Sequence, residues 1–105
     1  MDDLIATFMP KFAAIAKTRI AKTLALASQR SPDGVPTIAR ELHAIAGEAG
    51  LLGLAAIVNL ARTGEEHAKR LRSSRSDADA DALLASLTEL KSAIELVAPT
   101  SSPAA

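Results

Sequence analysis

The chain has 105 residues, with 12 basic and 12 acidic side chains, no cysteine, tryptophan or tyrosine, and a formal net charge of zero. The length suits one small domain. Balanced charge argues against a dedicated nucleic-acid binder, and the missing aromatic rings remove any base-stacking platform. The absence of cysteine excludes disulfides and thiolate metal sites and fits a cytoplasmic protein. No apolar run approaches the roughly 20 residues of a membrane span, and the acidic start lacks the basic residues of a signal peptide.

The first part of the chain predicts two helices that meet at Pro10. Residues 2–8 form a short helix with acidic side chains at the positive end of its dipole. Pro10 interrupts the pattern, because proline fits the first turn of a helix better than its middle. The second helix runs from Met9 to about Ser28. Its predicted buried face contains Phe12, Ile15, Ala16, Ile20, Thr23, Leu24 and Ala27.

Three more helices follow. Residues 31–36 form a turn by composition, and the next helix begins between Asp33 and Thr37 and ends near residues 50–53, where glycine can take the left-handed conformation. Another helix covers about residues 54–71. After a polar loop at residues 73–79, in which Ser76 or Asp77 is the expected cap, the last helix repeats large apolar residues at the spacing typical of helix bundles.

We therefore predict an all-α fold, an antiparallel up-down-up-down four-helix bundle with a short extra N-terminal helix. The bundle occupies residues 1–98, and the tail of residues 99–105, rich in Pro, Ser and Ala, is predicted to be disordered. The short length suits a monomer.

One histidine, His43, has unusually small neighbours. It lies at the edge of the apolar stripe of its helix, and the residues about one and two turns away are Ala39, Ala46, Gly47 and Gly50. A helical glycine is less stable than alanine by roughly 1 kcal/mol. We infer that the helix accepts this loss to keep one imidazole open to a partner.

Few other residues suggest chemistry. The sequence has no phosphate-binding glycine loop, no His-Glu-x-x-His pair and no calcium-loop spacing, so we predict no metal site. His67 lies among charged residues and is interpreted as a polar residue on a helix flank. The basic residues of the first helices are interpreted mainly as a solvated face.

The run from His43 to Gly53 resembles the signature of histidine-containing phosphotransfer (HPt) domains. The family pattern is His, any residue, Leu or Ile, usually Lys, then Gly, with a Leu-Gly pair further on. The matching positions are His43, Ile45, Gly47, Leu52 and Gly53, while Ala46 departs from the usual Lys. The resemblance in helix number and order covers nearly the whole chain.

The resemblance implies roles for individual residues. His43 would be phosphorylated, and Glu65, where the family usually has Glu or Gln, would orient the imidazole. Helix spacing alone points instead to Ala61 or Arg62, one turn earlier. Gly47 and Gly50 would leave room for the phosphoryl group, Ala39 and Ala46 would contact the partner, and Arg40 and Lys69, with Arg62 as an alternative, would support the phosphate in place of the missing Lys.

The implied function is a phosphorelay intermediate that exchanges phosphoryl groups with receiver domains of a hybrid histidine kinase and a response regulator. The chain has no ATP site and needs no cofactor of its own, since the Mg²⁺ is expected on the receiver. The alternative is a docking module that binds receivers without carrying phosphate, which Ala46 favours. A third possibility, an enzyme with a general-base histidine, lacks pocket-forming residues. No nucleic acid or membrane is expected as a partner.

Overall fold

The computed structural model describes the backbone of residues 2–97 and the side chains of residues 6–97. Within that part the chain forms four long helices and no strand: α1 (Asp2–Ser28), α2 (Val35–Leu51), α3 (Ala55–Ser74) and α4 (Asp77–Val97), with a 3₁₀ turn, η1 (Pro32–Gly34), before α2. The all-α prediction is confirmed for these residues. The predicted tail of residues 99–105 lies outside the described part.

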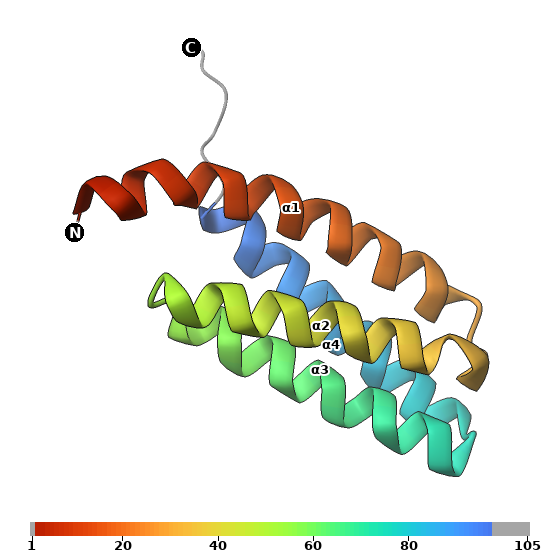
Figure 1. The fold of residues 1–105 in the computed structure, drawn as a ribbon. Coiled ribbons are helices and arrows are strands. Elements are labelled where there is room, and N and C mark those ends of the chain that lie inside the picture. Colours follow the sequence, from red (N-terminus) through yellow and green to blue (C-terminus); the bar gives the residue numbers. More distant parts are fainter. Residues whose placement is uncertain (1, 98–105) are drawn as a thin grey trace.

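The helices lie side by side, and short turns join consecutive helices (Figure 1). Helix α2 packs against α1 and α3, and α4 packs against the same two helices. Helix α2 is therefore diagonal to α4. No other helix of the described chain packs on the outer surface of α2.

The core lies along the axis of the bundle and draws on all four helices. Its fully buried larger side chains are Ile20, Val35, Ile38, Leu42, Ile45, Leu83, Leu87, Leu90 and Ile94. Helices α1 and α3 add Phe12, Ile57, Leu71 and several buried alanines, and the alanines allow the helices to approach closely. The prediction that Ile15 belongs to the buried face of α1 is wrong, because the residue is 46% exposed. It adjoins the stripe in a helical projection, but none of the described helices covers that flank of α1.

The predicted break at Pro10 is wrong. Helix α1 continues through Pro10 for 27 residues, so the separate helix at residues 2–8 does not exist. A proline inside a helix removes one backbone hydrogen bond and crowds one carbonyl. Pro10 is exposed, so the carbonyl that loses its partner faces water and the helix can continue.

The ends of the other helices follow the local sequence. Gly53 has a φ of +74°, the left-handed conformation that ends α2 and that glycine adopts without strain. The Oγ of Ser31 accepts a hydrogen bond from the Asp33 amide at the start of η1. Ser76 caps α4, as expected, because its Oγ accepts from the Asp79 amide at 3.1 Å. Helix α3 reaches Ser74, so most of the predicted loop at residues 73–79 is helical.

Candidate functional site

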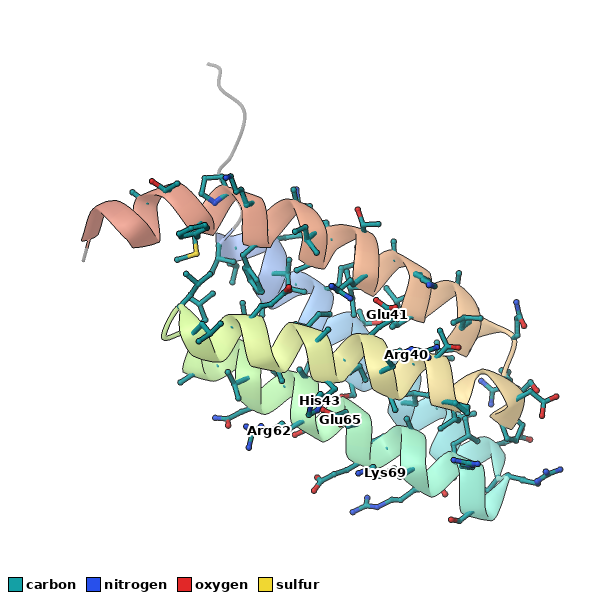
Figure 2. All side chains as sticks on the ribbon, viewed as in Figure 1. Arg40, Glu41, His43, Arg62, Glu65 and Lys69 are labelled. Atoms are coloured by element: carbon teal, nitrogen blue, oxygen red, sulfur yellow. The ribbon has the colours of Figure 1, made fainter. Side chains whose placement is uncertain are left out.

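His43 projects outward from the middle of α2 (Figure 2). Its neighbour Leu42 and Ile45, two residues further on, are both fully buried, and they fix the side of the helix that faces the core. The His43 side chain is 84% exposed. The expected exposure of the imidazole is therefore confirmed, and the ring can be approached from solvent.

Glu65 of α3 lies beside the imidazole. Its Oε1 is 3.8 Å from His43 Nδ1, and its side chain is only 16% exposed. This distance is too long for a hydrogen bond but allows an ion pair when the ring carries a proton on both nitrogens. Because Nδ1 faces Glu65, the opposite ring nitrogen, Nε2, points away from α3 and is the open one.

Two glycines, Gly47 and Gly50, leave the helix surface near the imidazole ring without side chains. A Cβ built on Gly47, one turn after His43, would meet nothing within 4 Å, and one on Gly50 would meet only Val58 Cγ2 at 3.9 Å. Close packing therefore does not require glycine at either position. A side chain at Gly47 would instead project into the space beside the imidazole.

The two alanines predicted to contact a partner lie on the other flank of His43. Ala46 is 5% exposed and belongs to the core, so the expectation that it offers open surface is wrong. It is one turn after Leu42, whose side chain faces Gly64 of α3, and α3 therefore covers that flank. Ala39 is half-buried. The open flank of α2 is the one toward α1.

The structure does not place the side chains of Arg40 and Lys69, which were predicted to support the phosphate, against the His43 imidazole. Arg40 Nη2 lies 3.4 Å from the Thr37 hydroxyl, so the guanidinium turns toward the preceding turn of α2 and away from His43. Lys69 is exposed one turn after Glu65. Arg62 is exposed one turn before Glu65 on α3.

Cross-helix ion pairs, which the sequence interpretation missed, join α1 to α2. Arg19 Nη1 is 2.9 Å from Glu41 Oε1, Lys22 Nζ is 3.6 Å from Glu41 Oε2, and Arg19 Nη2 is 3.8 Å from Glu48 Oε2. Glu41 and Glu48 are seven residues apart and therefore share one helix face, a signal that was present in the sequence. These contacts hold the Glu41 face of α2 against α1.

The ion pairs also decide the charge state of Glu41. Partial burial acts to raise the pKa of this carboxyl, but the hydrogen bond from Arg19 and the positive charges of Lys22 and Arg19 outweigh it. The net result is a Glu41 pKa below the usual 4.5. The pair therefore favours the ionised carboxylate in the folded protein.

Among the described side chains of residues 6–97, no three His, Asp or Glu residues are grouped so that they could hold a metal ion. None of the helices described combines the length and the apolar character that a bilayer crossing requires.

The fold and the site define a class: a small helical bundle that presents one exposed histidine, paired with a carboxylate, from the middle of a helix. The family model described as Hpt domain matches residues 12–98, and the chain belongs to this family. Searches of curated proteins and of solved structures found no match. Family membership implies a part in histidine phosphotransfer in two-component signalling, as a carrier without the ATP site of a kinase.

Proposed function

We propose that His43 carries a phosphoryl group between the receiver domains of a hybrid histidine kinase and a response regulator. The observation that carries this proposal is the 84% exposed imidazole with Nδ1 at 3.8 Å from Glu65. His67 offers no comparable arrangement, since it is only partly exposed and its Nδ1 is buried without a hydrogen-bond partner in the described chain.

The transfer step uses the open ring nitrogen. His43 Nε2 attacks the phosphorus of an aspartyl phosphate on the receiver, the new N–P bond forms, and the P–O bond to the aspartate breaks. The electron pair of that bond leaves with the aspartate as a carboxylate. The Nδ1 proton stays on the ring, and the Glu65 carboxylate stabilises the positive charge that develops there. The reverse step returns the phosphoryl group to a receiver aspartate.

Support for the phosphoryl charge comes from both partners. The receiver is expected to bring the Mg²⁺, and this chain needs no cofactor. On this side, Arg40 and Lys69 are the candidate supporting residues. Arg40 is exposed and its contact with Thr37 is long at 3.4 Å, so the guanidinium can turn toward a phosphoryl group on His43.

The receiver docks on the exposed flank of α2 between His43 and α1. Residues 40, 44, 47 and 51 recur at steps of four and three and form a row on this flank. It ends in Leu51, which is 88% exposed two turns beyond His43. Ile15 of α1 lies toward the same end, because it is one turn before Arg19, and Arg19 contacts Glu48. Because exposed apolar side chains that lie together mark binding surfaces, we propose that Leu51 and Ile15 both contact the receiver.

The second candidate is a docking module that binds receivers without accepting phosphate. Ala46 favours it, because the family usually has Lys there. In this structure residue 46 is buried against α3, so no basic side chain extends from that position toward the ring. Under either reading, we propose a cytoplasmic monomer.

The test is transfer from a phosphorylated receiver domain. We expect the wild-type chain to acquire acid-labile, base-stable phosphate and His43→Gln to acquire none. His67→Gln is the matched control and should be labelled like wild type. No label on the wild type would favour the docking module, and label on His43→Gln would show that another residue is the acceptor.

A further inference from the structure

Gly64 lies directly under the His43–Glu65 pair. It immediately precedes Glu65 on α3, and Leu42 immediately precedes His43 on α2. A Cβ built on Gly64 would approach Leu42 Cδ1 to 3.0 Å, a distance tighter than nine in ten real Cβ contacts. Both residues are buried, and Leu42 is 0% exposed. The Leu42 side chain thus occupies the space that a side chain at position 64 would need.

Backbone conformation does not explain this glycine. Gly64 is inside α3 and is absent from the residues with positive φ, so an L-amino acid could adopt its backbone angles. Glycine is unfavourable inside a helix compared with alanine. The close approach of Leu42 is therefore what an added side chain at this position would have to displace.

We propose that the contact of Leu42 with Gly64 sets the separation of α2 and α3 at this level and so positions Glu65 against the His43 imidazole. The separation of two packed helices depends on the side chains at their contact. Both reactive side chains project from residues adjacent to that contact. A wider separation would move Glu65 Oε1 beyond its present 3.8 Å from Nδ1. Leu42 and Gly64 are positioning residues, and they touch neither the phosphoryl group nor the partner.

This inference rests on the proposed phosphotransfer function, so its test needs a readout that does not require transfer. The first readout is the imidazole ¹⁵N spectrum of His43, which reports which ring nitrogen holds the proton. Glu65→Ala defines the spectrum of a ring without its carboxylate. We expect Gly64→Ala to shift the His43 signals toward those of Glu65→Ala, because the added methyl group pushes α3 away.

The second readout is transfer kinetics with a phosphorylated receiver. We expect Gly64→Ala to lower kcat roughly tenfold, since misplacement of a catalytic group by a fraction of an ångström is costly. KM should not change, because the exposed flank that binds the receiver is untouched. Gly34→Ala is the matched control, because a Cβ there would meet Leu26 Cβ at an ordinary 3.5 Å. It should retain the wild-type spectrum and kcat.

The decisive variant is the double substitution Leu42→Val with Gly64→Ala. Valine withdraws the Cδ atoms that the new methyl group would meet, so we expect the spectrum and kcat to return toward wild type. A merely destabilising effect of Gly64→Ala would not be rescued by a second core truncation. A wild-type His43 spectrum in folded Gly64→Ala, or no rescue in the double variant, would overturn the inference. If no variant accepts phosphate but the spectra change and recover as expected, the proposed function fails and the positioning role stands.

Discussion

Gly47 and Gly64 are both helical glycines, but an added methyl group would meet nothing within 4 Å at position 47 and Leu42 at 3.0 Å at position 64. The same substitution should therefore be accommodated freely at position 47, whereas at position 64 the Leu42 side chain must move by a few tenths of an ångström. At position 64 a methyl group would crowd the Leu42 side chain where α2 packs on α3. At position 47 the fold does not require glycine, and the free space beside His43 is what a larger side chain would remove.

The prediction for Gly47 separates stability from function. We expect Gly47→Ala to raise the free energy of unfolding by about 0.5–1 kcal/mol, because alanine is the better helix former. Gly47→Leu should also fold, but it should slow transfer from a phosphorylated receiver at least about tenfold by crowding the approach to the ring. Urea denaturation and transfer kinetics measure the two effects. Normal transfer by Gly47→Leu would contradict the steric role.

The individual helices are defined by local signals at their ends. Helix α4 begins with Ser76, whose Oγ accepts a hydrogen bond from the Asp79 amide, and with acidic Asp77 and Asp79 in its first turn. Acidic side chains at this end interact favourably with the helix dipole. Helix α2 ends at Leu51, and Gly53 then adopts the left-handed conformation that turns the chain away from the helix. These capping interactions involve only a few neighbouring residues, and they could therefore be predicted from the sequence.

The contribution of the Ser76 cap to stability can be tested by substitution. We expect Ser76→Ala to lower the free energy of unfolding by about 1 kcal/mol, because the Asp79 amide loses its acceptor. Ser92→Ala is the matched control, since Ser92 is exposed inside the same helix and alanine is favourable there. Denaturant unfolding of both variants measures the difference. Equal stability of the two variants would show that the cap contributes little.

Assembly of the bundle brings together groups that are distant in the sequence. Arg19 and Lys22 of α1 meet Glu41 of α2, and Arg30 Nη1 at the end of α1 lies 2.8 Å from Asp81 Oδ1 of α4. The first of these contacts holds α2 with its Glu41 face toward α1. His43 consequently faces the side shared by α2 and α3, where Glu65 lies.

The lowered pKa of Glu41 predicts the pH dependence of stability. A carboxyl with a lower pKa in the folded state than in the unfolded state stabilises the fold above the unfolded value, near 4.5. That contribution is lost as the pH falls through the folded pKa. We expect the Tm of wild type to drop more steeply than that of Glu41→Gln between about pH 6 and pH 3. Glu95→Gln, at an exposed position of α4, should follow wild type; parallel curves for wild type and Glu41→Gln would contradict the prediction.

The position of α2 in the bundle also predicts which exposed leucine binds the receiver. Leu51 of α2 and Leu96 of α4 are 88% and 87% exposed, but α4 is diagonal to α2. We expect Leu51→Ser to weaken receiver binding roughly tenfold and Leu96→Ser to leave it unchanged, because an apolar anchor counts only inside the interface. Titration calorimetry with a receiver domain measures both. Equal effects would place the docking surface elsewhere.

Sequence patterns alone were sufficient to predict the helical class of the protein, the exposed histidine of α2, the glycine that ends α2 and the serine that caps α4. Each of these depends on residues within one or two turns. Apolar periodicity predicts the helices and the residues outside their buried stripe, and cap and glycine residues predict the helix ends. The family resemblance added Glu65, which helix spacing alone placed one turn too early.

The flank of each helix that is covered could be assigned only from the packing of the helices. Ile15 and Ala46 both adjoin an apolar stripe, yet Ile15 is 46% exposed and Ala46 is 5% exposed. The difference arises because α3 covers the Ala46 flank of α2, whereas no described helix covers Ile15. Likewise, Leu42 and Gly64 are 22 positions apart in the chain, and their contact exists only once α2 and α3 pack. A one-dimensional pattern states how apolar a face is, whereas burial depends on where the neighbouring helices lie.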